Sequence, residues 1–169
     1  MADAGTGPMT DHHLIGLISD THGLMRSAVH SVLAGVELIL HAGDVGGDEI
    51  LDELALIAPV ISVYGNTDSL DDPRLAESIE RTIGSVRIHV SHGHELGIPT
   101  PAKLLARYSA DVIVYGHTHR QLVTRATDGR LVVNPGAAGA RRFQLVPSCA
   151  RLTIAGNRAD VEIISLGAE

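Results

Sequence analysis

The stretch VIVYGHTHR, residues 112–120, runs from an apolar, strand-like segment directly into two histidines. Its first three residues are β-branched, which is typical of a buried strand. Gly116 ends the apolar run, and His117 and His119 follow two positions apart. A single histidine at the end of a strand is usually explained by packing or hydrogen bonding. A pair at this position needs an explanation from the rest of the chain.

Four other strand-like segments of the chain end in a similar way. Each apolar run is followed by a carboxylate, a carboxamide or an imidazole, and the five closing residues are Asp20, Asp44, Asn66, His92 and His117. They lie 22 to 26 residues apart, which is about the length of a strand and its return connection. The carboxyl ends of parallel strands share one edge of a sheet, and ligands bind there. We therefore expect these side chains to converge, joined by His22 and His119.

Two Asp, one Asn and four His form a donor set that suits divalent metals. Each residue alone has an ordinary explanation, because Asp and Asn are common in turns and histidines often pack at strand ends. Such an explanation would be needed seven times, so the joint pattern favours a metal site. Seven ligands suit two cations about 3.5–4 Å apart that share a carboxylate. With Asp20, Asp44 and a bridging hydroxide, two divalent cations leave a positive site that attracts a phosphate.

The first half of the chain alternates strand-like and helix-like segments. This order favours parallel strands with helices outside the sheet. Asp48 is a suitable cap for the second helix. The predicted elements are strands over residues 13–19, 37–42 and 59–65, and helices over residues 24–35 and 48–58.

The second half is rich in hairpins, which favours antiparallel strands. A helix over residues 100–110 is expected to open with Thr100 as its cap and Pro101 at its first position. The three predicted hairpins turn at Gly84-Ser85, Asp128-Gly129 and Gly156-Asn157. Mixed sheets with flanking helices combine the two halves most economically. Residues 1–13 lack periodicity and predict a flexible tail, which leaves residues 14–169 as a single domain.

Composition limits the kinds of partner. Of the 169 residues, 44% are hydrophobic but only 2% are aromatic, so the core must be aliphatic. The net charge of −7 disfavours long nucleic acids, and Arg141-Arg142 is the only tight basic pair. The chain has one cysteine, Cys149, which suits a reducing cytoplasm. No apolar run approaches the roughly 20 residues of a membrane span. These features predict a soluble cytoplasmic protein that binds a small anion.

Taken in order, the motifs resemble those of the calcineurin-like metallophosphoesterase superfamily. The series is DTH (20–22), GDV (43–45), GNTD (65–68), SHGH (91–94) and GHTH (116–119). The short length and the NPG at 134–136 place the resemblance nearest the small bacterial and archaeal phosphodiesterases. It spans residue 14 to about residue 166. The fold it implies is α/β, with two mixed sheets packed as a sandwich and helices on both outer faces, a four-layer αββα arrangement.

The resemblance also implies a dinuclear metal-dependent phosphodiesterase that hydrolyses small phosphodiesters by attack of a metal-bridging hydroxide. It assigns one cation to Asp20, His22, Asp44 and His119, and the other to Asp44, Asn66, His92 and His117. Asp44 is then the bridge, and Asp44, Asn66 and His92 are the catalytic residues. Mn²⁺ is the expected metal, with Fe, Zn, Ni and Co as alternatives. Small members of the group often form dimers or tetramers, so a homo-oligomer is a further implication.

Two residues depart from the superfamily pattern. Many members carry His where this chain has Thr67, and threonine cannot act as a general acid near neutral pH. Ala137 follows NPG where Ser is frequent. Two other functions stay open: a phosphomonoesterase, and a non-catalytic interaction scaffold like the metal-poor retromer subunit of the same superfamily. A scaffold is expected to have lost ligands, and this chain carries all seven.

Three further polar residues near the motifs are assigned supporting roles. His41 lies inside a strand pattern and is interpreted as a packed core histidine. Asp68 is expected to orient a neighbouring group instead of binding metal. His94 is interpreted as a solvated loop residue, with a contact to substrate as the alternative.

Overall fold

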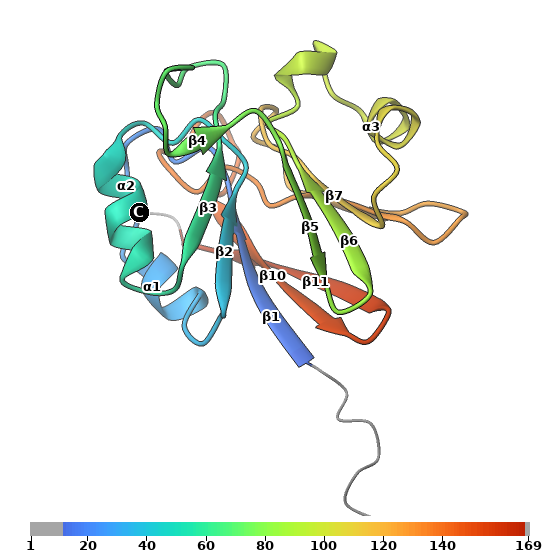
Figure 1. Ribbon diagram of the computed structural model, residues 1–169. Helices are drawn as coiled ribbons and strands as arrows, with labels where there is room; N and C mark the ends of the chain where they lie inside the picture. Colours follow the sequence, from blue (N-terminus) through green and yellow to red (C-terminus); the bar gives the residue numbers. More distant parts are fainter. Residues whose placement is uncertain (1–11, 168–169) are drawn as a thin grey trace, which may run out of the picture.

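The computed structural model describes residues 12–167 of the chain, and Figure 1 shows their arrangement. Within these residues, two mixed β-sheets form the body of the fold. The first has six strands, in the order β11 (Arg158–Ser165), β10 (Ser148–Ala155), β1 (His12–Ile18), β2 (Leu38–His41), β3 (Val60–Val63) and β4 (Leu75–Ala76). The second has five, in the order β5 (Ile79–Ile83), β6 (Val86–Val90), β7 (Val112–Val114), β9 (Leu131–Asn134) and β8 (Leu122–Arg125).

Both sheets combine parallel and antiparallel pairs, as the sequence predicts. Strands β1 to β4 are parallel, and β10 and β11 complete the first sheet as an antiparallel hairpin. In the second sheet β6, β7 and β9 are parallel, while β5 and β8 pair antiparallel at its edges. The three predicted hairpins are therefore present. The parallel strands of each sheet end at a common edge, and the loops that leave this edge carry the predicted ligands.

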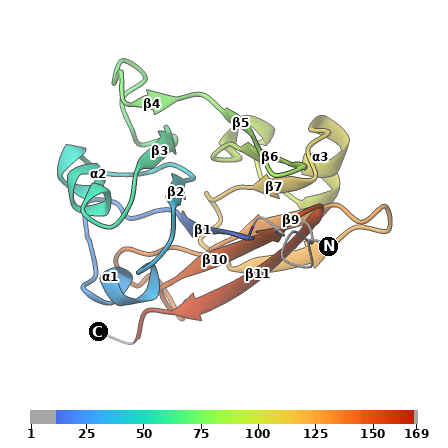
Figure 2. The ribbon, with the colours of Figure 1, turned by 60° about the horizontal axis from the view of Figure 1, so that its bottom comes forward.

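Helices cover the outer faces of both sheets, as Figures 1 and 2 show. Val29 and Leu54 of two helices share a buried cluster with Ile39 of the first sheet. Leu104 of a third helix packs on Ile113 of the second sheet. The predicted four-layer αββα arrangement is confirmed. The helices are α1 (Ala28–Val32), α2 (Asp48–Ala55) and α3 (Pro101–Arg107), with a short 3₁₀ helix, η1 (His94–Leu96).

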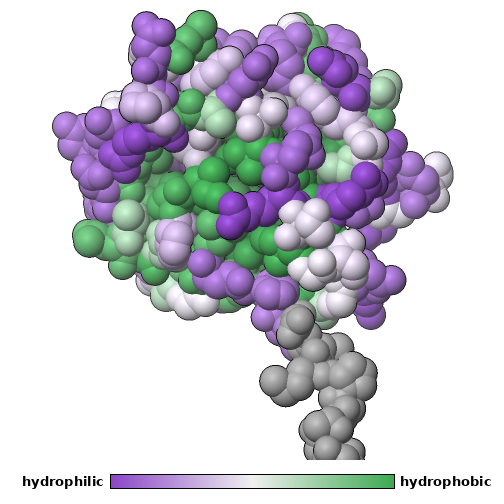
Figure 3. All heavy atoms as spheres, in the orientation of Figure 1, coloured by the Kyte–Doolittle hydropathy of each residue, from purple (hydrophilic) through white to green (hydrophobic). Residues whose placement is uncertain are grey.

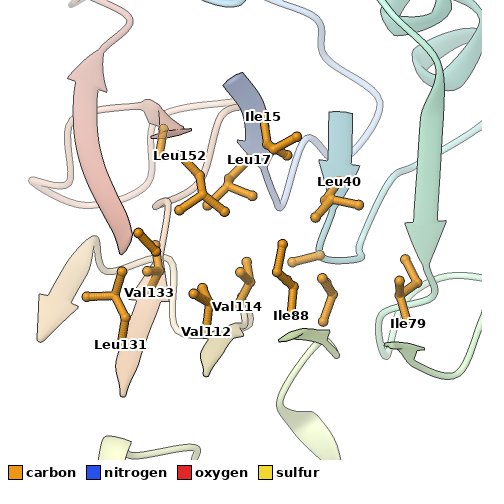
Figure 4. Packing of buried hydrophobic residues seen from close by; sticks show 14 of the residues in the cluster. Ile15, Leu17, Leu40, Ile79, Ile88, Val112, Val114, Leu131, Val133 and Leu152 are labelled. Atoms are coloured by element: carbon orange, nitrogen blue, oxygen red, sulfur yellow. The ribbon is translucent and has the colours of Figure 1, made fainter. Parts of the chain in front are cut away.

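An aliphatic layer fills the space between the two sheets (Figure 4). Leu17 and Leu40 of the first sheet face Ile88 and Val114 of the second, and all four are fully buried. On the open side of the sandwich, between β3 and β5, Figure 3 shows a hydrophobic strip bordered by hydrophilic side chains. Burial of apolar surface contributes about 25 cal/mol per Å². In a chain so poor in aromatic residues, burial of aliphatic side chains supplies most of the hydrophobic stabilisation.

The amino-terminal elements begin and end at residues other than those predicted. Strand β1 begins at His12, because His12 and His13 pair with β10. These two residues therefore do not belong to the predicted tail, and residues 1–11 lie outside the described part of the chain. The helix predicted over residues 24–35 is shorter in the structure, where only the residues of α1 are helical. It starts late because the N–H of Leu24 bonds to the carbonyl of Thr21 in a turn.

Two further differences concern α2 and β4. The helix predicted over residues 48–58 ends at Ala55, and Gly47 takes the cap position because Asp48 is already helical. Strand β4 was not predicted, since two residues are too short to show a period. Across residues 12–167, no helix has both the length and the apolar character needed to cross a bilayer.

Candidate metal centre

Loops that follow five strands bring the seven predicted ligands into one cluster. Each of the seven side chains has a polar atom within 3.5 Å of another member of the cluster. The predicted convergence is therefore observed, while the binding of metal by these residues stays a prediction. The cluster consists of Asp20 and His22 after β1, Asp44 after β2, Asn66 after β3, His92 after β6, and His117 and His119 after β7.

Asp20 is the centre of the first half of this cluster. Its Oδ1 atom lies 3.2 Å from His119 Nε2 and 3.7 Å from His22 Nε2. Its Oδ2 atom accepts hydrogen bonds from Ser19 Oγ at 2.6 Å and from the backbone N–H of His117 at 3.1 Å. The side chain is fully buried. One carboxylate oxygen is thus held in place by the protein, and the other faces the two imidazoles.

His92 is the centre of the second half. Its Nε2 atom lies 3.2 Å from Asp44 Oδ2 and 3.1 Å from Asn66 Oδ1, and Asn66 Oδ1 is also 3.1 Å from His117 Nδ1. On the other side of the ring, Nδ1 lies 2.8 Å from the carbonyl oxygen of Ala42. A carbonyl only accepts, so Nδ1 carries a proton. In the neutral ring, Nε2 then presents its lone pair to the cluster, as a metal ligand must.

Both carboxylates lie between the two halves. His22 Nε2 is 3.5 Å from Asp44 Oδ2, and His92 Nε2 is 3.9 Å from Asp20 Oδ1. Asp20 can share a cation with His22 and His119, or with Asp44 and His92, because in each group the ligand atoms lie within 4.8 Å of one another. The resemblance names Asp44 alone as the shared ligand. The geometry places Asp20, like Asp44, near histidines of both halves.

Backbone conformation marks the same residues. Among the described residues, six besides glycine have φ in the left-handed region, and five of them belong to the cluster. Such conformations cost about 1 kcal/mol or more each and are found mainly at functional sites. The surrounding sheets therefore hold the ligand loops in a shape that serves the cluster at the expense of local stability. The five are Asp20, His22, Asp44, His117 and His119, with φ between 45° and 71°.

Two glycines allow this close approach of loops. A Cβ atom at Gly65 would collide with the backbone and carboxylate of Asp44. A Cβ atom at Gly116 would collide with Ser19 Oγ and Asp20 Oδ2. The glycines of the GNTD and GHTH motifs are therefore required to seat the two carboxylates.

The electrostatics of the cluster favour a cation. Burial opposes ionisation of Asp20, but His119, His22 and His92 outweigh it and hold the pKa of its carboxyl well below the ordinary range. Burial opposes ionisation of Asp44 too, yet His92 and Thr67 lower its pKa from 3.8 to about 2. Burial also opposes protonation of His92, but Asp44 and Asp20 raise its pKa. Carboxylates that stay ionised and stabilise a positive charge nearby also attract a metal ion.

Ligand atoms without partners show that the residues fit a metal. Asp20 Oδ1 and His22 Nε2 are buried and make no hydrogen bond. A buried polar atom without a partner costs about 1–3 kcal/mol, more if it is charged. A divalent cation would satisfy both atoms, and carboxylate, amide and imidazole donors suit such an ion.

The sequence profile of the calcineurin-like phosphoesterase superfamily domain matches residues 14–157. The chain belongs to this superfamily. A probable metallophosphoesterase from Methanothermobacter thermautotrophicus is 39% identical to it, over 92% of this chain and 94% of that protein. A phosphodiesterase from Methanocaldococcus jannaschii is 29% identical, over 72% of this chain and 82% of that protein.

A solved structure shows the same fold. Vacuolar protein sorting 29 from Cryptosporidium parvum superposes with a TM-score of 0.77 at 25% identity, covering 91% of this chain and 98% of that one. The resemblance stated from the motifs is therefore confirmed. The superfamily is one of phosphoesterases, which are hydrolases. The relative from Methanothermobacter thermautotrophicus is named a probable metallophosphoesterase.

Thr67 stands where many members of this superfamily carry His, and the structure gives it a supporting role. Its backbone N–H and its hydroxyl both donate to Asp44 Oδ1, at 3.0 and 2.7 Å. The neighbouring Asp68 accepts from the backbone N–H groups of Val45, Gly46 and Gly65. The prediction that Asp68 orients its neighbours is confirmed. Together the two residues hold the loops that carry Asp44 and Asn66.

His41 connects two ligand loops, a role that the sequence analysis missed. It is buried as predicted, and burial lowers its pKa to about 4, so the ring is neutral. Its Nδ1 accepts from the N–H of Gly43 at 3.1 Å, so its Nε2 carries the proton and donates to Thr21 Oγ1 at 3.0 Å. Thr21 in turn donates to the carbonyl of Val45 at 2.7 Å. A buried histidine in an apolar strand gives no sequence signal for such a link.

His94 lies beside the cluster and is not a fully solvated loop residue. Its side chain is half-buried, and its ring centroid is 5.3 Å from that of His92 and 6.3 Å from that of His117. Its Nδ1 atom is buried and makes no hydrogen bond. The SHGH motif thus places two imidazoles side by side at the end of β6.

The lowered pKa of Asp44 predicts a contribution to acid stability in the metal-free protein. Folding favours the ionised carboxylate, so the contribution is full above pH 4 and decreases as the pH falls towards 2. We expect chelator-treated wild type to lose about 1 kcal/mol more unfolding free energy than Asp44→Asn between pH 6 and pH 3. Urea denaturation at the two pH values measures this difference. Equal losses would show that the carboxyl titrates normally.

Proposed function

We propose that the chain is a dinuclear metal-dependent phosphodiesterase that hydrolyses small phosphodiesters. The convergence of seven oxygen and nitrogen donors, two of them buried without partners, is the observation that supports this proposal. Mn²⁺ is our first choice of metal, with Fe, Zn, Ni and Co as alternatives. Two such cations would polarise the phosphoryl oxygens and lower the pKa of a water molecule enough for it to attack phosphorus.

The protein's own residues would hold and neutralise this centre. Asp20 and Asp44 supply two negative charges, because the pKa of each carboxyl is lowered. Asn66 and the histidines add neutral donors, so the loaded site keeps a positive charge that attracts a phosphate. The Thr67 hydroxyl donates its hydrogen bond to Asp44 and is not a source of protons for the leaving oxygen. We therefore propose that the enzyme works best on esters with good leaving groups.

A diester is favoured over a monoester for two reasons. The relative from Methanocaldococcus jannaschii is named as a phosphodiesterase. In addition, the seven-residue cluster contains no Arg or Lys that could balance the second charge of a monoester dianion. We expect the Mn²⁺-loaded enzyme to hydrolyse bis(p-nitrophenyl) phosphate with a kcat/KM at least about tenfold above that for p-nitrophenyl phosphate, a difference of about 1.4 kcal/mol. A clear preference for the monoester would overturn this choice.

A non-catalytic scaffold is the second candidate, because vacuolar protein sorting 29 shares the fold. The two candidates differ in what they require of the cluster. A scaffold has no need of strained loops or buried donors without partners, and this chain has both. Metal analysis of protein that has been treated with a chelator and reloaded with Mn²⁺ tests whether the chain meets the enzyme's requirement. Fewer than about one equivalent bound would favour the scaffold.

We further propose that the enzyme acts in the cytoplasm on small molecules. Cys149 is the chain's one cysteine, and it is buried, with its pKa raised to about 12 by burial. Such a thiol needs no oxidising compartment. The net charge of −7 repels long polyanions, whereas the cluster attracts a single phosphate.

A further inference from the structure

A groove of about 480 Å³ borders the metal centre on the side of the second sheet. His117 belongs to both, since it lines the groove and contacts Asn66 of the cluster. The other lining residues are mostly apolar, among them Ile98, Pro99, Tyr115 and Leu122. Pockets of this size and character hold small molecules. A molecule in the groove would therefore have one end within reach of the cations.

One wall of the groove is the segment between η1 and α3, and the protein holds it rigidly. Lys103 Nζ donates to the carbonyl oxygen of Ile98 at 2.9 Å and to that of Leu96 at 3.4 Å. Thr100 Oγ1 accepts from the N–H of Lys103 at 3.2 Å, so the segment runs directly into a capped helix, as predicted. Ile98 is nonetheless 74% exposed. Ile98 therefore adds exposed apolar surface to one wall of the groove, beside the other apolar residues that line it.

The same wall contacts the loop that carries a ligand. A Cβ atom at Gly93 would lie 3.0 Å from Pro99 Cγ, so the absence of a side chain there lets Pro99 pack against this loop. Gly93 directly follows His92 of the cluster. The groove and the metal centre are thus built on one continuous piece of backbone.

The opposite wall is the connection from β7 to β8, and it supplies a positive charge. Arg120 lines the groove, is exposed, and forms no ion pair with any described residue. Its charge attracts an anionic molecule to the groove, while Ile98 and Leu122 supply apolar surface for the rest of that molecule. A second pocket, which His94 lines, is less suited to this role, because its two glutamates, Glu77 and Glu95, outnumber its one arginine, Arg107.

We propose that this groove binds the retained alcohol group of a phosphodiester, and that this group is apolar and contains a ring. The inference rests on the proposed function, since it places the phosphate at the metal centre. It names the substrate class: diesters in which one alcohol is aromatic or a hydrocarbon ring. A diester that carries such a ring should have a kcat/KM at least about tenfold above that of the methyl ester, because the ring buries apolar surface in the groove.

Three esters with the same leaving group test the proposal on the Mn²⁺-loaded protein: the phenyl, methyl and glyceryl esters of p-nitrophenyl phosphate. We expect the phenyl ester to have the highest kcat/KM, at least about tenfold above the other two. Ile98→Ser should lower the phenyl-to-methyl ratio at least about threefold. Leu56→Ser is the matched control, because Leu56 is 80% exposed at the end of α2, on the other sheet, and should leave the ratio unchanged.

Each outcome decides a different point. Equal rates for the three esters, or a preference for glyceryl, would overturn the apolar groove while leaving the phosphodiesterase intact. An unchanged ratio in Ile98→Ser, with a thermal midpoint like that of wild type, would also overturn it. Failure to hydrolyse any of the three esters would overturn the proposed function, and this inference with it.

Discussion

Replacing Asp44 by Asn should lower kcat/KM for a phosphodiester by at least about 1000-fold, a loss of about 4 kcal/mol of transition-state stabilisation. Asp44 Oδ2 lies between His92 and His22, which belong to different halves of the cluster. An amide there removes one of the two negative charges of the cluster but keeps the shape of the side chain. Its oxygen can still accept the two hydrogen bonds from Thr67. The loss should therefore come from the missing charge and not from a displaced loop.

Steady-state kinetics on the Mn²⁺-loaded protein measure the loss, and metal analysis shows whether the cations are still bound. Asp160→Asn is the matched control, because Asp160 is an exposed carboxylate on β11 at the edge of the first sheet. It should keep wild-type activity. Metal-dependent hydrolysis by Asp44→Asn within about fivefold of wild type would show that Asp44 does not hold the metals.

The sequence predicted the place of the site because strand ends are easy to locate. Five apolar runs end in a donor, and the topology of parallel strands then brings those donors to a common edge. The sequence also showed that Thr67 replaces the His found in many members. It could not show that Thr67 contacts Asp44, because this hydrogen bond depends on the fold of two loops that are 23 residues apart in sequence.

The parts that the sequence missed depend on geometry that no residue pattern encodes. The left-handed conformation of Asp20 or His119 has no signature, since these residue types are common in ordinary turns. The link through His41 needs the ring to be neutral and placed between two loops, which follows from burial alone. The sequence of strand β4 is too short to show an alternating pattern of apolar residues. The strand forms because Leu75 and Ala76 pair with β3.

Removing one ligand from each half of the cluster should remove one cation each time. We expect wild type to bind about two equivalents of Mn²⁺, and His119→Ala and Asn66→Ala to bind about one each. His119 contacts Asp20, whereas Asn66 contacts His92 and His117, so the two variants damage different halves. The kcat/KM for a phosphodiester should fall at least about 100-fold in both variants. Each variant lacks the catalytic contribution of one cation, and its remaining ligands are less well oriented.

Metal analysis after dialysis, with circular dichroism to confirm folding, measures the equivalents bound. The position of Asp20 makes the result informative, since its Oδ1 atom lies near histidines of both halves. If Asp20 and Asp44 both join the cations, loss of one cation exposes two carboxylates to each other, and the remaining ion should bind more tightly to compensate for their repulsion. One equivalent in wild type would mean a mononuclear centre. Complete loss of metal in either variant would mean that the two halves form a single, inseparable site.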